Sequence, residues 1–238
     1  MKITIIRHAE PDNPNNTLTP RGFIEAEALG KHHSAKEFDE VYCSSLPRAR
    51  LTCDALIKGE KEAHVVDWLR EFTHPFIDED GEEHHNWDFL PSYIEKHPEI
   101  VFDEGYLESP LLSTASMKKE YDHVVSEFDK VLARHGYYRK GRFYQVEEAN
   151  TKNIAFVCHF GMMSVLLSHI MGVPYTLLAQ FTCCQPTGIT TLVSEEREKG
   201  KAQFRMLEYG NVAHLAKENL IPSFHGRFCE IYDSEDRH

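Results

Sequence analysis

The sequence predicts an α/β fold in three layers, with a mainly parallel sheet flanked by helices on both faces. Short β-branched apolar runs alternate along the chain with segments of helical periodicity, a pattern typical of parallel strands joined by crossover helices. The length of 238 residues suits one domain with an insertion, so we expect residues 1–238 to form a single domain. Residues 72–116 mix acids, prolines and aromatics without a sustained period, and we expect a helical or irregular insertion there that caps the functional site.

The chain begins with a strand, a loop and a helix. Residues 2–7 read KITIIR, an apolar run of strand length, and the turn-rich sequence PDNPNNT follows soon after it. Thr19 and Pro20 are a typical N-cap and first helical residue, and apolar residues recur at helical spacing from there to Gly30. We therefore expect a buried first strand whose helix covers the sheet.

A second and a third unit repeat this pattern. Residues 40–43 predict a short strand, and the apolar stripe within residues 46–57 predicts a helix whose N-cap is Ser44 or Ser45. Residues 65–69 predict the strand of a third unit, after which the insertion begins.

The second half of the sequence contains the strongest helix signal. Residues 116–135 place their apolar side chains on one helical face, and Gly136 ends the pattern. Residues 153–158, which read NIAFVC, predict another buried strand, and residues 162–171 predict a helix. Two further strands are expected at 188–194 and 203–207.

Charge and composition exclude several classes of protein. The chain has 26 Lys and Arg against 38 Asp and Glu, a formal net charge of -12 that repels nucleic acids and anionic membrane surfaces. No apolar run approaches the roughly 20 residues that span a bilayer, and the first run is too short for a signal peptide, so we expect a cytoplasmic protein. The 6 cysteines lack paired spacing, which argues against a disulfide framework and against structural zinc.

Polar side chains follow three of the predicted strands at the point where each strand ends. Arg7 and His8 close the first strand, Arg48 follows the second, and His159 comes directly after residues 153–158. The carboxyl ends of parallel strands lie at one edge of a sheet, and binding sites form at that edge. We therefore expect these side chains to converge.

Two arginines and two histidines suit a phosphoryl group. Guanidinium groups bind phosphate oxygens in bidentate pairs, and an imidazole donates to a phosphate oxygen or attacks phosphorus. Neighbouring residues of a strand point to opposite faces, so Arg7 and His8 share a pocket only if the regular strand stops between them. The turn from Ala9 to Pro11 makes such a stop the expected structure.

Several short motifs around these residues occur in a fixed order. They are Arg7-His8-Ala9, LTPRG at residues 18–22, YCSSLPRA at 42–49 followed by Thr52, LRE at 69–71 and VCH at 157–159. In this order they resemble the histidine phosphatase superfamily, also called phosphoglycerate mutase-like, and they span most of the expected core. The resemblance is to the phosphatase branch, because the loop after His8 lacks the Thr-x-Trp-Asn run and following arginine typical of phosphoglycerate mutases.

The resemblance implies a role for each residue of the site. His8 matches the nucleophile that becomes phosphorylated, and Glu71 matches the proton donor. Arg7, Arg48 and His159 match the rest of the phosphate pocket, and His159 also belongs to the catalytic set. The implied activity is that of a histidine acid phosphatase, a phosphomonoester hydrolase that uses a phosphohistidine intermediate and needs no metal ion or other cofactor.

The assignment of the proton donor has alternatives within the sequence. Carboxylates that could replace Glu71 are Asp12 in the first loop and Glu79, Glu82 or Glu83 in the insertion.

The second histidine motif departs from the family pattern. Glycine usually follows this histidine, whereas Phe160 here separates His159 from Gly161. Arg70, beside the proposed proton donor, is expected to be a surface or ion-pair residue.

Other functions fit parts of the pattern. A phospho-ligand or phosphoprotein binding module with weak activity would use the same pocket in signalling, and a phosphoglycerate-type mutase would return the phosphoryl group to its substrate. A Cys-His hydrolase would need Cys158 and His159 on one face, which a regular strand does not allow. His84 and His85 lie among acidic residues that suit a divalent cation, but a solvated acidic loop is the expected structure.

The expected substrate is a small phosphomonoester or a phosphopeptide. The acidic run within residues 72–116 disfavours polyanions such as nucleoside triphosphates. We expect no nucleic-acid or membrane partner, and a homodimer is an assembly that the sequence allows.

Overall fold

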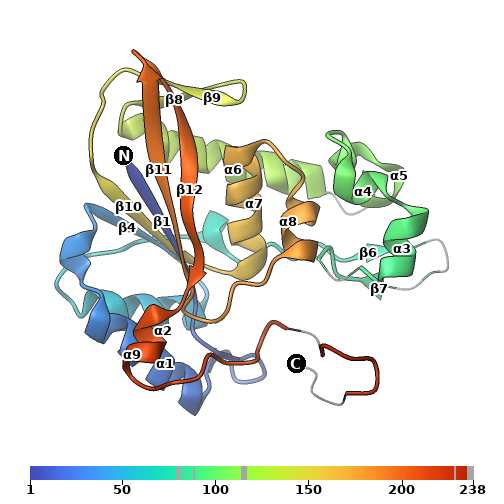
Figure 1. Ribbon diagram of the computed structural model, residues 1–238, viewed down its shortest axis with the longest axis horizontal. Helices are drawn as coiled ribbons and strands as arrows, with labels where there is room; N and C mark the ends of the chain where they lie inside the picture. Colours follow the sequence, from blue (N-terminus) through green and yellow to red (C-terminus); the bar gives the residue numbers. More distant parts are fainter. Residues whose placement is uncertain (79–80, 82, 88, 114–116, 228, 235–238) are drawn as a thin grey trace.

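The structure is a computed structural model that describes residues 1–78, 81, 83–87, 89–113, 117–227 and 229–234. Within this part of the chain, eight strands form one sheet with helices on both faces, which confirms the expected α/β class (Figure 1). From edge to edge the strands are β5 (His64–Val66), β4 (Glu40–Ser44), β10 (Asn153–Cys158), β1 (Lys2–Arg7), β11 (Ile189–Glu198), β12 (Lys201–Asn211), β9 (Phe143–Val146) and β8 (Tyr137–Lys140).

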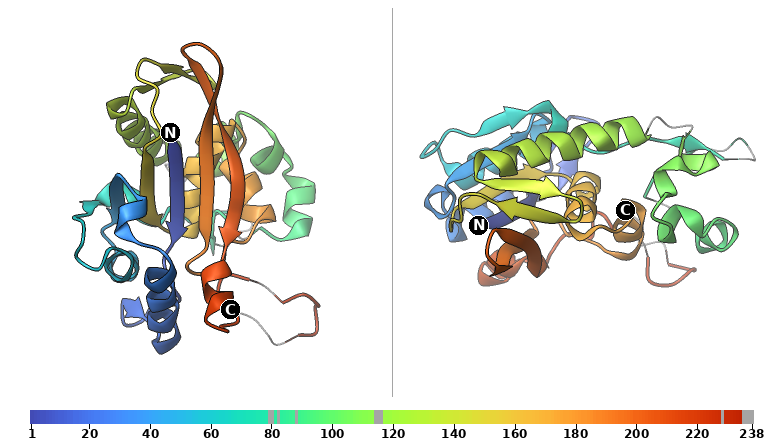
Figure 2. Two further views of the ribbon diagram at one scale, coloured as in Figure 1. Left: turned by 60° about the vertical axis from the view of Figure 1, so that its left-hand side comes forward. Right: turned by 90° about the horizontal axis from the view of Figure 1, so that it is seen from above.

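The sheet is mixed, and the expectation of a mainly parallel sheet is corrected on this point. β1 pairs in parallel with β10, β10 with β4, and β4 with β5. The other half consists of two hairpins, β11 with β12 and β8 with β9, which pair antiparallel with each other and with β1 (Figure 2). The strands of a hairpin are joined by a short turn and must run antiparallel, whereas parallel strands need a long crossover.

Helices cover both faces of the sheet. One face carries α1 (Pro20–His32), α2 (Pro47–Ile57) and the short α9 (Ala213–Lys217), and the other carries α6 (Met117–Arg134), α7 (Phe160–Met171) and α8 (Tyr175–Phe181). Alternate residues of β1 enter the two cores, because Ile3 and Ile5 pack in one apolar cluster and Ile6 packs in the other. The 3₁₀ helices are η1 (Ala35–Glu37), η2 (Asp67–Leu69) and η3 (Tyr106–Glu108).

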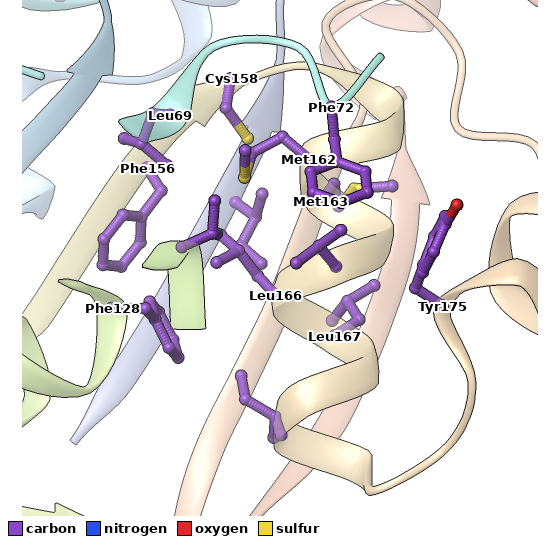
Figure 3. Packing of buried hydrophobic residues seen from close by; sticks show 14 of the residues in the cluster. Leu69, Phe72, Phe128, Phe156, Cys158, Met162, Met163, Leu166, Leu167 and Tyr175 are labelled. Carbon is purple, nitrogen blue, oxygen red and sulfur yellow. The ribbon is translucent and has the colours of Figure 1, made fainter. Parts of the chain in front are cut away.

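α7 is the central helix of the larger core. Its residues Met163 and Leu166 are fully buried, and they pack among Phe128 of α6 and Phe156 of β10 (Figure 3). Interiors are packed about as densely as organic crystals, so such a helix has little freedom to shift. The packing therefore fixes the position of His159, the N-cap residue of α7.

α2 begins without the predicted cap. Its N-cap residue is Leu46, which makes no side-chain cap hydrogen bond, so the prediction of Ser44 or Ser45 was wrong. The two hydroxyl groups have other partners: the Ser44 hydroxyl lies 2.8 Å from a ring nitrogen of His159, and that of Ser45 donates to Asp67 over 2.5 Å.

Residues 72–116 form short elements beside α6 and α8. They are β6 (Phe76–Ile77) paired with β7 (Glu83–His84), then α3 (Pro91–Lys96), α4 (Glu99–Phe102) and α5 (Pro110–Ser113). α4 contacts α8 and α5 contacts α6, which places these helices at one side of the molecule (Figure 1). Among the described residues of this segment, Phe72 to His74 line the cavity that also contains Glu71.

Two further observations complete the fold. A two-stranded pair, β2 (Pro11–Asp12) with β3 (Thr17–Leu18), follows β1. None of the helices in the described part of the chain is both long and apolar enough to cross a bilayer.

Candidate active site

Arg7, His8 and His159 come together because β1 and β10 are adjacent parallel strands. Arg7, the last residue of β1, lies opposite Cys158, the last residue of β10. His8 and His159 are the next residues, and their ring centroids are 4.9 Å apart. Both histidines are almost fully buried, with exposed fractions of 2% and 0%. β1 ends at Arg7, so the strand stops where a shared pocket for Arg7 and His8 requires it.

The hydrogen bonds of His8 define its tautomer. Its Nδ1 lies 2.7 Å from the carbonyl oxygen of Ala9, and a carbonyl only accepts, so Nδ1 carries the hydrogen. The lone pair is then on Nε2, to which Nε of Arg48 donates over 3.3 Å. Burial, and next the charges of Arg7 and Arg48, hold the pKa of His8 well below its usual range. His8 is therefore a neutral imidazole whose nucleophilic nitrogen faces a guanidinium group.

Two guanidinium groups supply positive charge to the pocket. Arg48 extends from the first turn of α2, and Arg7 extends from the end of β1 with only 6% of its surface exposed. One amino group of Arg7 donates to the carbonyl oxygen of Cys184, but its buried Nε has no hydrogen bond to a described residue. Buried polar atoms normally have a partner, so this unused donor indicates a ligand that supplies oxygen atoms.

His159 presents a second unused donor. The hydroxyl of Ser44 accepts the backbone N–H of Leu46 over 3.3 Å and lies 2.8 Å from Nε2 of His159, to which it can donate its hydrogen. In that arrangement the ring hydrogen of His159 is on Nδ1, which is buried and has no hydrogen bond within the described part of the chain. Burial, followed by the nearby imidazole and guanidinium groups, lowers the pKa of His159 well below its usual range. A neutral His159 can therefore donate one hydrogen bond to a bound anion.

Glu71 follows η2 and reaches the start of α7. Its Oε1 accepts the backbone N–H groups of Phe72 and Met162 over 3.0 and 3.1 Å. Gly161 permits this close approach, because a Cβ at that position would lie 2.8 Å from Oε1. Burial raises the pKa of Glu71 despite the opposing charges of the two arginines. The carboxyl group therefore keeps its proton to a higher pH than an exposed glutamate does.

One ligating atom from each of His8, Glu71 and His159 forms a group in which all three atoms lie within 4.8 Å of one another. Imidazole and carboxylate groups are common metal ligands, so this spacing is compatible with a cation. The charges of Arg7 and Arg48, however, act on the same three side chains and oppose a second positive charge. Together with the unused donors, they make an oxyanion the better ligand.

Among the described residues, Glu71 is the one carboxylate in that group of three. Asp12 instead accepts a hydrogen bond from the side chain of Asn15 over 2.8 Å, and Glu83 is exposed in β7. Glu79 and Glu82 lie outside the described residues.

Two other sequence hypotheses find no support among the described residues at their positions, which for the cation site exclude Glu79, Asp80 and Glu82. Cys158 is buried, and its thiol hydrogen is directed to the carbonyl oxygen of His159, not to the imidazole. Burial also raises the pKa of Cys158, which keeps it a thiol. His84 pairs with Asp78 over 2.7 Å.

Residues 223–227 adjoin the site, although no sequence pattern predicted this. A Cβ on Gly226 would lie 2.5 Å from Nη1 of Arg7, so the backbone at Gly226 rests against the guanidinium group. The charge of His225 is close enough to contribute to the lowered pKa of His8. In Figure 1 this dark red stretch runs along the side of the molecule on which β1 ends.

A sequence model of the histidine phosphatase superfamily (branch 1) matches residues 3–105. This match confirms the histidine phosphatase resemblance. The matched residues include Arg7, His8, Arg48 and Glu71, whereas His159 lies beyond them. No curated protein matches the sequence significantly.

Solved structures with the same fold are similar along most of both chains. A phosphoserine phosphatase mutant from Entamoeba histolytica, solved with phosphoserine, is 22% identical, with a TM-score of 0.56 over 90% of this chain and 98% of the other. A putative alpha-ribazole-5'-P phosphatase from Escherichia coli is 20% identical, with a TM-score of 0.51 over 89% and 98%. A mycobacterial glucosyl-3-phosphoglycerate phosphatase, solved with VO3, is 15% identical, with a TM-score of 0.53 over 87% and 97%. At these identities the likeness shows a shared fold.

Proposed function

We propose that the protein is a phosphomonoester hydrolase that transfers a phosphoryl group first to His8 and then to water. The observation that carries the proposal is the geometry around His8. Its Nδ1 donates to a backbone carbonyl, so the Nε2 lone pair faces Arg48. Ligating atoms of Glu71 and His159 lie within 4.8 Å. Nucleophile, anion donors and proton donor thus share one pocket, as phosphoryl transfer requires.

In the first step, Nε2 of His8 attacks phosphorus and the bond from phosphorus to the ester oxygen breaks. The electron pair of that bond leaves on the oxygen, which takes the proton of Glu71, so the alcohol departs neutral. Arg7, Arg48 and His159 donate hydrogen bonds to the other phosphate oxygens and stabilise the charge that they carry in the transition state.

In the second step, water attacks the phosphorus of the phosphohistidine. Glu71, now a carboxylate, accepts a proton from that water as the new bond from oxygen to phosphorus forms. The bond from phosphorus to Nε2 breaks, its electron pair returns to His8, and inorganic phosphate is released. Over the two steps, His8 and Glu71 return to their starting protonation states, and one water molecule is consumed.

The histidine acid phosphatase type is supported by the two pKa shifts. His8 needs to be neutral, and its lowered pKa keeps it so into the acidic range. Glu71 needs its proton for the first step, and its raised pKa extends the range in which it holds one. The two requirements overlap on the acidic side of neutrality.

The structurally similar proteins support a phosphomonoester as the substrate class. They are described as phosphatases of phosphoserine, of an alpha-ribazole phosphate and of a glucosylated phosphoglycerate. What these compounds share is the phosphate monoester, the group that the pocket around His8 suits.

The test is hydrolysis of p-nitrophenyl phosphate with EDTA present, by wild type, His8→Ala and His123→Ala. His123 is an exposed histidine of α6 far from the proposed chemistry and serves as the matched control. We expect turnover by wild type and His123→Ala and none by His8→Ala. Turnover by His8→Ala at the wild-type rate would refute the proposed nucleophile.

A second measurement separates the alternative functions. Rapid acid-free quenching of wild type with a radiolabelled phosphomonoester should leave label on the protein, and His8→Ala should carry none. Phosphate binding without label or turnover would instead identify a binding module, and label that returns to an alcohol acceptor would identify a mutase.

A further inference from the structure

A cavity of about 230 Å³ lies on the Glu71 side of the site. Its lining includes Asp67, Arg70, Glu71, His74, Glu120 and Met162. In the proposed reaction, Glu71 protonates the ester oxygen, so the part of the substrate beyond that oxygen extends past Glu71. The cavity is therefore the place for the leaving group. Its volume is below the roughly 300–1,000 Å³ of sites for drug-sized ligands, so a small alcohol fits it better than a peptide.

Arg70 brings an uncompensated positive charge to this cavity. Arg70 is exposed, as expected of a surface residue, and within the described part of the chain its side chain makes no hydrogen bond and no ion pair. The pKa of His159 is lowered by burial, by nearer charged groups and, to a smaller extent, by the charge of Arg70. Arg70 is thus a cation at the cavity that has no anionic partner among the described residues.

Glu120 brings an uncompensated negative charge to the same cavity. It lies in the first turn of α6, and its side chain has no ion pair with a described residue. His74 does not neutralise it, because burial lowers the pKa of His74 and favours the neutral ring. The other acids of the lining have partners: Asp67 accepts the hydroxyl of Ser45 over 2.5 Å, and Glu71 accepts two backbone N–H groups.

We propose that this cavity selects phosphomonoesters of small zwitterionic alcohols, with Arg70 binding a carboxylate and Glu120 binding an ammonium group of the leaving group. The inference rests on the proposed function and names the substrate class of the same site. Opposite charges that line one cavity without pairing are both satisfied by a ligand that carries both signs, whereas a neutral alcohol satisfies neither. A dianionic leaving group would meet repulsion from Glu120.

The test compares four phosphomonoesters that differ in the charges of the alcohol. O-phospho-L-serine carries both charges, phosphoglycolate only a carboxylate, phosphoethanolamine only an ammonium group, and glycerol phosphate neither. We expect wild type to have the highest kcat/KM for O-phospho-L-serine. Because charge-assisted hydrogen bonds are worth roughly tenfold or more in binding, Arg70→Gln should lower the ratio of phosphoserine to phosphoethanolamine turnover about tenfold. Glu120→Gln should lower the ratio of phosphoserine to phosphoglycolate turnover by a similar factor.

Control variants and a binding measurement make the outcome decisive. Arg50→Gln in α2 and Glu27→Gln in α1 change exposed charges away from the cavity and should leave all ratios at their wild-type values. Calorimetric titration of His8→Ala with the same four compounds tests the selectivity without turnover. Equal affinity for all four, or equal losses on all four in Arg70→Gln and Glu120→Gln, would overturn the inference. Hydrolysis of p-nitrophenyl phosphate that depends on His8 would leave the proposed function standing in that case.

Discussion

Nε of Arg48 lies 3.3 Å from Nε2 of His8, so the cation stands beside the lone pair that the proposed reaction uses. This relationship predicts that Arg48 contributes mainly to the transition state. Arg48→Ala should lower kcat for p-nitrophenyl phosphate roughly 100- to 1,000-fold, or about 3–4 kcal/mol, as the loss of a comparable electrostatic donor does.

The control for this prediction is Arg50→Ala, which removes an exposed arginine of the same helix. Steady-state kinetics should give Arg50→Ala the kcat of wild type and Arg48→Ala a kcat roughly 100- to 1,000-fold lower. If Arg50→Ala lost as much activity, damage to α2 rather than a missing donor would explain both results.

The pKa shifts of His8 and Glu71 predict a bell-shaped pH dependence of kcat/KM for an alkyl phosphate. Activity should fall at low pH only below the lowered pKa of His8, where the nucleophile becomes protonated. It should fall again as the pH rises through the raised pKa of Glu71, where the proton donor is lost. The measurement is the pH profile of wild type and Glu71→Gln with an alkyl phosphate and with p-nitrophenyl phosphate.

Glu71→Gln should lose most of its kcat/KM on the alkyl phosphate and little on p-nitrophenyl phosphate, because the phenolate leaves without a proton. The limb at higher pH should therefore depend on the leaving group. A flat profile for the alkyl phosphate, or an equal loss on both substrates, would make Glu71 a binding residue instead of the acid.

Gly161 predicts a second way to displace Glu71. In Gly161→Ala the new Cβ would lie 2.8 Å from Oε1 of Glu71 and 3.2 Å from the carbonyl oxygen of Phe72, so the carboxyl group must move. We expect the kinetic pattern of Glu71→Gln, with alkyl phosphates affected far more than p-nitrophenyl phosphate. Gly105→Ala, where a Cβ meets no atom within 4 Å, is the matched control and should behave as wild type.

Gly226 predicts a role for residues 223–227 in phosphate binding. A Cβ in Gly226→Ala would lie 2.5 Å from Nη1 of Arg7, so the guanidinium group must shift and KM should rise several-fold. Gly59→Ala is the control: Gly59 also has a positive φ, +71° against +90° at Gly226, which costs an alanine about 1 kcal/mol of stability, but a Cβ there meets no atom within 4 Å. An unchanged KM in Gly226→Ala would separate this segment from the site.

The parallel half of the fold and the pocket at its edge were predictable because their signals are local. The run of residues 2–7 and the run of 153–158 read as buried strands, and both are strands in the structure. When two such strands are parallel and adjacent, the residues that follow them lie close together. The sequence alone therefore predicted that His8 and His159 are neighbours. Thr19 likewise caps α1 as its residue type indicates, by accepting the backbone N–H of Gly22 over 2.9 Å.

The rest depended on tertiary contacts that leave no periodic signal. The hairpin of β8 and β9 was missed because its strands are short and separated by two residues. The sheet is mixed because this hairpin and that of β11 and β12 pair antiparallel. Ser44 or Ser45 was expected to cap α2 from its residue type, but the Ser44 hydroxyl is hydrogen-bonded to the buried ring of His159 and the Ser45 hydroxyl to Asp67. Glu71 was identified through the family resemblance and not through any pattern, since it follows a single 3₁₀ turn.

The position of β1 has a consequence for the synthesis of the chain. β1 precedes both of its neighbours in the sheet, β10 and β11, along the chain. Arg7 lies opposite Cys158 on one side, and Gly226 rests against its guanidinium group. Such distant pairings form slowly, and they cannot form before the later residues leave the ribosome. A nascent chain therefore contains His8 long before the residues that surround it, and the candidate site can assemble only after residue 226 has been translated.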